Sequence, residues 1–147
     1  MEHCDQGTLR RALDGGRLRD ITTGLTSLPL ALQMARDVAA AMEYLHEESI
    51  LHGDLKASNV LLKSQSGAGA GPHVSMTDFD PGCLIAKVSD FGLSRSIDAS
   101  ATHVSSIHAG TLTHMSPELL LDGKGSKASD VYAYGAARAR VCFGACA

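Results

Sequence analysis

Residues 27–48 have the period of an amphipathic helix and lead directly into a short string of reactive side chains. Ser27 is a plausible N-cap, and Pro29 suits the first turn of a helix. Apolar residues then recur at steps of three and four, at Leu28, Leu32, Ala35, Val38, Ala39, Met42 and Leu45. This pattern predicts a long helix that ends near residues 46–48 and buries that apolar stripe in a core.

Two polar strings follow this helix, His52-Gly53-Asp54-Leu55-Lys56-Ala57-Ser58-Asn59 and Asp90-Phe91-Gly92. The first string holds an acid, a base and an amide, and the second places another acid beside a glycine. Phosphoryl transfer from a metal-bound nucleotide needs a carboxylate for the acceptor's proton, a lysine for phosphate charge and oxygen ligands for Mg²⁺. The two strings together contain these groups, so phosphoryl transfer is the leading chemical hypothesis.

Two short apolar runs flank a segment of different composition. Residues 60–62 and 84–88 are typical of short buried strands. Residues 64–83 between them are rich in small residues and lack an apolar period, so we expect a flexible, exposed insertion. Its glycines do not follow a strand and open a helix, which a phosphate-cradling loop would require.

The two strings resemble the catalytic loop and the metal-binding motif of eukaryotic protein kinases. Residues 110–118 resemble the end of a kinase activation segment, and residues 130–135 resemble the start of the large central helix. Residues 1–9 look like the hinge that joins the two kinase lobes. The whole set is most similar to the tyrosine-kinase-like group of serine/threonine kinases. The resemblance therefore implies a partial protein kinase domain over residues 1–135.

The resemblance implies a catalytic or metal-binding role for five residues. Asp54 would act as the base that orients the acceptor hydroxyl, and Lys56 would neutralise charge on the transferred phosphoryl group. Thr111 would hydrogen-bond toward both of these residues. Asn59 and Asp90 would supply oxygen ligands to Mg²⁺, with Asp90 bridging the metal to the phosphates of ATP.

The resemblance also implies residues that bind adenine or support the site. The implied adenine-binding residues are Met1, Glu2, Cys4 and Leu61. The implied structural residues are His52, Phe91, Gly92, Glu118 and Asp130. His52 would pack against an inward-facing Phe91, and Gly92 would allow a sharp backbone turn. Asp130 would anchor the backbone of the catalytic loop, and Glu118 would pair with an arginine far downstream.

The sequence departs from the kinase pattern in three ways. It contains no glycine-rich loop, no strand lysine for the phosphates and no helix glutamate to pair with that lysine, so we expect the N-lobe to be absent. Residues 136–147 are interpreted as a divergent C-terminal tail that lacks the arginine expected for Glu118. Gly53 replaces the usual arginine before the catalytic acid, so control through a phosphate bound by that arginine is not expected.

These features predict an α+β fold: a protein-kinase-like C-lobe fragment, mainly α-helical, with short β-hairpins around the active-site loop. The implied function is transfer of phosphate from ATP, with Mg²⁺, to a serine or threonine hydroxyl of a protein substrate, with this chain inactive by itself. The alternative is a non-catalytic kinase-like module that binds protein partners or binds nucleotide weakly.

The composition is typical of a soluble globular protein, with 44% hydrophobic and 20% charged residues. A net charge of −3 gives no reason to expect binding to nucleic acid or to an anionic membrane. No apolar run reaches membrane-spanning length, and the N-terminus lacks a signal-peptide pattern, so we expect an intracellular, cytoplasmic location. The four cysteines lack zinc-ligand spacing and are interpreted as free thiols. The oligomeric state stays open.

Overall fold

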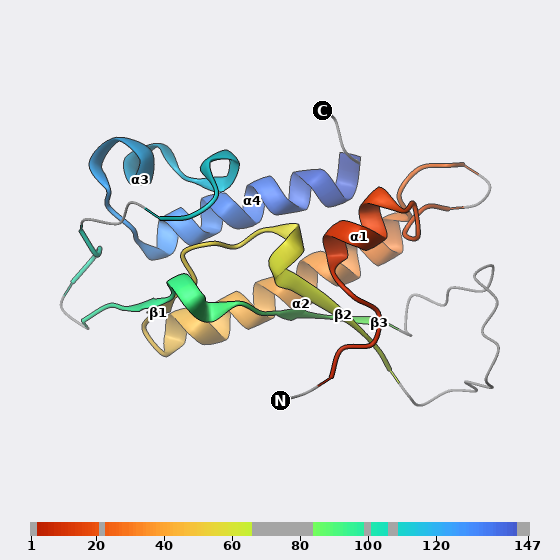
Figure 1. Ribbon diagram of the computed structural model, residues 1–147, viewed down its shortest axis with the longest axis horizontal. Coiled ribbons are helices and arrows are strands. Elements are labelled where there is room, and N and C mark those ends of the chain that lie inside the picture. Colours follow the sequence, from red (N-terminus) through yellow and green to blue (C-terminus); the bar gives the residue numbers. More distant parts are fainter. Residues whose placement is uncertain (1–2, 21–22, 66–83, 99–100, 106–108, 144–147) are drawn as a thin grey trace.

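A computed structural model describes residues 3–20, 23–65, 84–98, 101–105 and 109–143 (Figure 1). The helices in these residues are α1 (Leu9–Asp14), α2 (Leu28–Glu47), α3 (Pro117–Asp122) and α4 (Lys127–Phe143). The strands are β1 (Ile50–Leu51), β2 (Val60–Ser64), β3 (Leu84–Val88) and β4 (Arg95–Ser96). The expected α+β class is confirmed, because helices dominate and two small antiparallel sheets flank the catalytic loop.

Helix α2 has the predicted ends, but its buried face differs from the predicted one. The residues buried on α2 are Leu30, Ala31, Met34, Val38, Met42 and Leu45. Leu28 and Leu32 were expected in the core and are instead 63% and 54% exposed. In the first half of α2, two sets of apolar residues each recur at helical spacing, one containing Leu28 and Leu32 and the other containing Leu30 and Met34. The second set is buried because β3 and α4 pack against that face of the helix.

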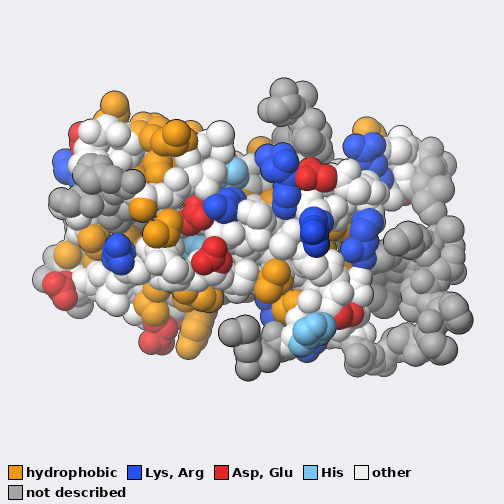
Figure 2. All heavy atoms as spheres, in the orientation of Figure 1, with side chains coloured by type: hydrophobic (Ala, Val, Ile, Leu, Met, Phe, Trp, Pro, Cys, Tyr) orange, Lys and Arg blue, Asp and Glu red, His pale blue; other side chains and the backbone are white. Residues whose placement is uncertain are grey.

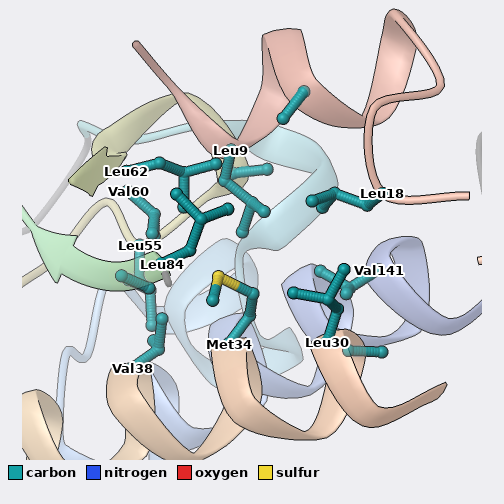
Figure 3. Close-up of a cluster of buried hydrophobic side chains, with 14 of the residues drawn as sticks. Leu9, Leu18, Leu30, Met34, Val38, Leu55, Val60, Leu62, Leu84 and Val141 are labelled. Atoms are coloured by element: carbon teal, nitrogen blue, oxygen red, sulfur yellow. The ribbon is translucent and has the colours of Figure 1, made fainter. Parts of the chain in front are cut away.

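One cluster of buried apolar side chains joins most of the elements (Figure 3). Leu9 from α1, Met34 from α2 and Val141 from α4 meet in this cluster. Leu55 and Ala57 of the catalytic loop belong to the same cluster and are 0% and 3% exposed. The apolar positions of the catalytic loop therefore fix it to the core, and its polar side chains point elsewhere.

Strands β2 and β3 form an antiparallel hairpin, which confirms both strands predicted on either side of the insertion. Their register runs from Val60 opposite Val88 to Ser64 opposite Leu84. The predicted flexible insertion begins at the outer end of this hairpin, and from residue 66 onward it lies outside the described residues. The inner end of the hairpin is the one that carries the predicted metal ligands.

Two side chains of α2 hold β3 in place. Gln33 Nε2 donates a hydrogen bond to the backbone oxygen of Leu84 at 2.5 Å. The backbone N–H of Ala86 donates to Asp37 Oδ2 at 3.0 Å. These bonds satisfy backbone groups on the edge of β3 that β2 does not pair. The position of β3 is thus set by a helix of the core as well as by its partner strand.

Helix α4 begins before residues 130–135, which were expected to start the large central helix, and continues beyond them. It begins at Lys127 because Ser126 and Ser129 cap its first turn reciprocally, each backbone N–H donating to the other's hydroxyl at 3.2–3.3 Å. Residues 136–143, expected as part of a divergent tail, continue the helix, and Val141 is buried. Among the described residues, no helix has both the length and the apolar character needed to span a membrane.

Candidate active site

Asp54 lies at the centre of a polar network that unites the three residues predicted as catalytic. Its Oδ2 accepts a hydrogen bond from Lys56 Nζ at 2.6 Å. Its Oδ1 accepts from the backbone N–H and the hydroxyl of Thr111, at 2.9 and 2.8 Å. Lys56 Nζ also donates to the Thr111 hydroxyl at 2.8 Å, across 55 positions of sequence. The fold therefore brings together an acid, a base and a hydroxyl that the sequence holds far apart.

The Asp54 carboxyl is ionised at neutral pH. Its partial burial opposes ionisation, but the hydrogen bonds from Lys56 and Thr111 outweigh the burial and hold the pKa of Asp54 below its ordinary value. An ionised carboxylate only accepts hydrogen bonds, so it can orient a hydroxyl that approaches from solvent. Lys56 at the same time places a positive charge where negative charge would develop during phosphoryl transfer.

Asp130 on α4 anchors the backbone of the catalytic loop. Its side chain is nearly fully buried, and its two oxygens accept hydrogen bonds from the backbone N–H groups of His52 at 2.9 Å and Gly53 at 3.0 Å. His46 Nε2, in the last turn of α2, lies 3.0 Å from Asp130 Oδ2. Because a buried carboxylate is costly unless paired, these bonds tie the loop to α4 tightly. The arrangement is the one predicted for an anchor.

His52 is fully buried and connects the catalytic loop to the segment before Asp90. Its Nδ1 accepts from the backbone N–H of Asp54 at 3.3 Å, so Nε2 carries the proton and donates to the Ser89 carbonyl at 3.1 Å. The His52 and Phe91 rings lie 5.4 Å apart at 52°, which is the contact expected from the sequence. The inward orientation expected for Phe91 is wrong, since its side chain is 50% exposed. Its ring meets His52 on one side only.

Gly53 and Gly110 allow close backbone contacts around Asp54, and sequence reasoning assigned no role to Gly110. Gly53 has φ +79°, and a Cβ there would lie 2.9 Å from the backbone oxygen of Leu93. Gly110 has φ +132°, and a Cβ there would lie 3.1 Å from the Gly53 oxygen. An arginine at position 53, usual in the kinase pattern, would therefore require the backbone near Leu93 to shift. The sequence feature that could have indicated this close contact is the position of Gly110 directly before Thr111.

Asn59 and Asp90 lie at the inner end of the β2–β3 hairpin. The backbone N–H and hydroxyl of Ser89 both donate to the Asn59 backbone oxygen, at 2.8 and 2.9 Å. Asn59 Nδ2 donates to the backbone oxygen of Asp54 at 2.8 Å and to Asp54 Oδ2 at 3.2 Å, which fixes the amide. Its carbonyl oxygen accepts only a long bond, of 3.5 Å, from the Ser58 hydroxyl among the described residues. Asp90 directly follows Ser89 and is exposed. Both predicted metal ligands thus belong to one short stretch of paired backbone.

The donor set of Asn59 and Asp90 fits a magnesium-bound nucleotide. An amide carbonyl and a carboxylate are hard oxygen donors, and Mg²⁺ in nucleotide sites is held by one or two such groups together with phosphates and waters. Within the described residues, no group of three or more His, Cys, Asp and Glu side chains could hold a metal. A site built from these two residues would therefore rely on phosphate oxygens of the nucleotide.

The sharp turn that was predicted at Gly92 is made by Asp90. Asp90 has φ +64° and ψ +72°, in the left-handed region, whereas Gly92 has no positive φ. Aspartate tolerates this conformation because its short side chain can bond locally, and Asp90 Oδ1 accepts from the Gly92 N–H at 3.4 Å. A Cβ at position 92 would lie 3.3 Å from the same Oδ1. Gly92 therefore leaves space for the Asp90 carboxylate.

The predicted adenine-binding residues are only partly described. The hinge segment runs beside β2, where Gln6 N–H donates to the Leu62 oxygen at 3.1 Å and Leu62 N–H donates to the Gly7 oxygen at 2.8 Å. Leu61 and Cys4 are half-buried, and Leu61 points to the strand face opposite Leu62. Met1 and Glu2 lie outside the described residues.

Glu118 sits exposed in the first turn of α3, close to the start of α4. The Ser129 hydroxyl donates to Glu118 Oε1 at 3.4 Å. No arginine in the described part of the chain forms an ion pair with Glu118. The expected partner far downstream has no counterpart in these residues.

Comparisons with known proteins agree with the resemblance carried by the motifs. A family model described as protein tyrosine and serine/threonine kinase matches residues 1–143. A probable LRR receptor-like serine/threonine-protein kinase of Arabidopsis thaliana is 38% identical over 124 residues, which cover 81% of this chain and 17% of the relative. An LRR receptor kinase of Oryza sativa subsp. japonica is 37% identical over 124 residues, which cover 81% of this chain and 18% of the relative.

A relative outside plants shows a similar match. A mitogen-activated protein kinase kinase kinase of Caenorhabditis elegans is 34% identical over 141 residues, which cover 88% of this chain and 13% of the relative. The chain thus spans less than a fifth of the length of these three curated relatives.

Proposed function

Because this chain belongs to the protein tyrosine and serine/threonine kinase family, we propose that it supplies the catalytic-loop half of a serine/threonine kinase active site. The reaction is transfer of the γ-phosphoryl group of ATP to a hydroxyl of a protein substrate. The family generally uses ATP and Mg²⁺. The observation that carries the proposal is the Asp54–Lys56–Thr111 network, which holds a base and a cation at one point.

Asp54 orients the acceptor hydroxyl by accepting its hydrogen bond, and it receives the proton as the oxygen bonds to phosphorus. Its hydrogen bonds to Thr111 and Lys56 fix the direction in which the carboxylate accepts. Lys56 offsets negative charge at the reacting oxygens without changing position. Bound Mg²⁺–ATP supplies the phosphoryl group and a leaving group whose charge is partly neutralised. Asn59 and Asp90 are the proposed protein ligands of that metal.

The proposed acceptors are serine and threonine side chains. The relatives described as serine/threonine kinases support this choice, as does the presence of Lys56 and Thr111 at the matching positions. The proposal includes a cytoplasmic location, where ATP is available. The free thiols of Cys4 and Cys142 are typical of a reducing compartment and support it.

Transfer of radiolabelled phosphate from ATP tests the proposal in two forms of the protein. The 147-residue chain alone is expected to stay at background, because its sequence holds no strand lysine to position the phosphates. The same chain, joined after the upper lobe of the Oryza relative, is expected to phosphorylate serine and threonine peptides in preference to tyrosine peptides.

Three variants of the joined protein decide the roles of the residues. Asp54→Asn is expected to lower the rate on the order of 100-fold or more, because it removes the base. Asp90→Ala is expected to remove the dependence of the rate on Mg²⁺ concentration along with most of the activity. Asp98→Asn, an exposed acid outside the network, should leave the rate unchanged. A joined protein that binds ATP and transfers nothing would favour the non-catalytic module, and transfer that survives Asp54→Asn would refute the assigned base.

A further inference from the structure

Helix α1 and the turn after it carry a concentration of positive charge that the catalytic site does not use. Residues 10–19 contain four arginines and a single acid, Asp14, which gives this stretch a net charge of +3 in a chain whose net charge is −3. Figure 2 shows Lys and Arg side chains gathered on the part of the visible face that carries α1. The charge distribution of the chain is therefore strongly uneven.

Among the residues that the structure describes, three of these arginines have no carboxylate partner. Arg10 pairs with Asp14 one turn along α1 and is neutralised. Arg17 donates to the side-chain and backbone oxygens of Gln6, at 2.6 and 3.2 Å, so it is fixed in position with its charge uncompensated. In the described part of the chain, no carboxylate forms an ion pair with Arg11, Arg17 or Arg19. We call these three residues the arginine surface.

Two glycines bring the arginine surface together. A Cβ at Gly15 would lie 4.0 Å from Arg17 Cγ, and a Cβ at Gly16 would lie 3.5 Å from Arg19 Cδ. The apolar stems of both arginines therefore lie against a turn that has no side chains of its own. Arg11 on α1 is exposed, whereas Ala12 beside it is buried in the core. Arg11 and Arg19 are thus exposed and Arg17 is half-buried, all within nine residues of chain.

The arginine surface adjoins the catalytic loop. Helix α1 packs against the turn formed by Ala57–Asn59, and Leu9 of α1 shares the buried cluster with Leu55 and Ala57. Figure 1 shows α1 beside the start of β2, into which that turn leads. The arginine surface therefore lies on a helix and turn whose helix packs directly against the loop that carries Asp54.

We propose that the arginine surface binds an acidic segment of the substrate protein, next to the residue that is phosphorylated. This inference rests on the proposed function, since it assumes that a protein hydroxyl approaches Asp54. Guanidinium groups bind carboxylates through paired hydrogen bonds, and glutamate or aspartate side chains in a peptide match the three uncompensated charges of the surface. The net negative charge of the rest of the chain favours a short acidic peptide over a long polyanion such as nucleic acid.

Binding of labelled peptides to the full 147-residue chain, without ATP, tests the surface directly. The probe is a fluorescein-labelled peptide with one serine flanked by glutamates, and its partner replaces every glutamate with glutamine. At about 50 mM salt we expect the glutamate peptide to bind at least about 10-fold more tightly, with the difference shrinking as salt is raised. Equal binding of the two peptides would overturn the inference.

Matched charge-removing variants separate the surface from overall charge. The double variant Arg11→Gln/Arg19→Gln is expected to lose the preference for the glutamate peptide. The control double variant Arg36→Gln/Arg138→Gln removes two exposed arginines elsewhere and should keep the preference. Far-ultraviolet circular dichroism checks that both variants fold. Equal losses in the two double variants, or tighter binding of a 20-nucleotide single-stranded DNA or of phosphatidylserine vesicles to the same arginines, would refute an acidic peptide as the partner.

The peptide-binding test does not depend on whether the protein transfers phosphate. Asp54→Asn should bind the glutamate peptide as the unmodified chain does, because the base is outside the surface. If the joined protein fails to transfer phosphate while the arginine-dependent peptide preference persists, only the proposed function fails. If transfer is efficient and glutamate and glutamine peptides are equal in binding and rate, only the arginine surface fails.

Discussion

The catalytic loop, residues 52–59, and the metal-side segment, residues 90–93, are held by very different numbers of contacts. In the loop, His52 is fully buried, and the Asp54 carboxylate accepts four hydrogen bonds of 2.6–3.2 Å. In the segment, Asp90 is exposed in a left-handed conformation, and its side chain accepts one bond of 3.4 Å. The acceptor side of the site is thus formed by folding itself, whereas the metal side retains an open carboxylate.

The difference has a physical basis in burial. Polar groups removed from water must be paired, so the buried loop is specified by a complete network that includes Asp130. Exposed groups such as the Asp90 carboxylate keep their hydration and need no partner in the folded protein. Substitutions on the two sides should therefore separate stability from ligand binding, with large folding effects in the loop and small ones in the segment.

Asp130→Ala should have the largest effect, a loss of about 3–5 kcal/mol in the free energy of unfolding, because it leaves the buried N–H of His52 and the part-buried N–H of Gly53 unpaired. Asp130→Asn keeps an acceptor and should lose less. Urea unfolding followed by circular dichroism measures both, with the exposed Asp122→Ala as a control expected within about 0.5 kcal/mol of the unmodified chain. A change below about 1 kcal/mol for Asp130→Ala would mean that the loop is held by other contacts.

His52→Ala and Phe91→Ala compare the two partners of one ring contact. His52→Ala should cost about 2–4 kcal/mol, since it opens a cavity and leaves the Asp54 N–H and the Ser89 carbonyl without their partner. Phe91→Ala should cost about 1 kcal/mol, because half of that side chain is already exposed. The same urea titrations decide the matter, and equal costs would show that both sides of the site are fixed by packing.

Acid should weaken the Asp54 network. A carboxyl whose pKa is lowered by folding stabilises the protein above its ordinary pKa of 3.8, and that contribution is lost as the pH falls through the lowered value. The unmodified chain should therefore exceed Asp54→Asn in unfolding free energy by about 1.5–3 kcal/mol at neutral pH, and the gap should close on acidification. Unfolding free energies measured from pH 7 to pH 2.5 test this, and a gap that widens in acid would contradict it.

Asp90→Gly should change stability least, by less than about 1 kcal/mol. Glycine relieves the left-handed strain of Asp90 but adds backbone entropy to the unfolded chain, and these effects are similar in size. The same substitution should abolish any Mg²⁺-dependent binding of ATP, which isothermal titration calorimetry measures. A loss of stability above about 2 kcal/mol would show that the metal-side segment is part of the folded network after all.

Features set by neighbouring residues were predictable from the sequence. The ends of α2 follow from Ser27, Pro29 and the loss of apolar period after Leu45, and the β2–β3 hairpin follows from two short apolar runs. The meeting of Asp54 and Thr111 was inferred through resemblance to a family. Neither periodicity nor spacing alone would have paired residues so far apart.

Features set by tertiary packing were not predictable. Leu28 and Leu30 are both reasonable core residues for a helix, and only the placement of β3 and α4 decides between them. The exposure of Phe91 depends on what covers its outer side, which no local pattern encodes. The left-handed backbone of Asp90 was assigned to Gly92 because glycine adopts positive φ most easily, yet a side-chain bond lets aspartate do so here.

The attachment of β3 to α2 through Gln33 and Asp37 has a consequence for how this chain can change in length. Ser64 and Leu84 are held opposite each other, so the two ends of any segment inserted between them stay the same distance apart whatever its length. Doubling the length of such a loop costs only about 0.6 kcal/mol in closure entropy. The outer end of the hairpin is thus a site where lineages can gain or lose residues, and where a fluorescent reporter can be inserted, while Asn59 and Asp90 keep their spacing.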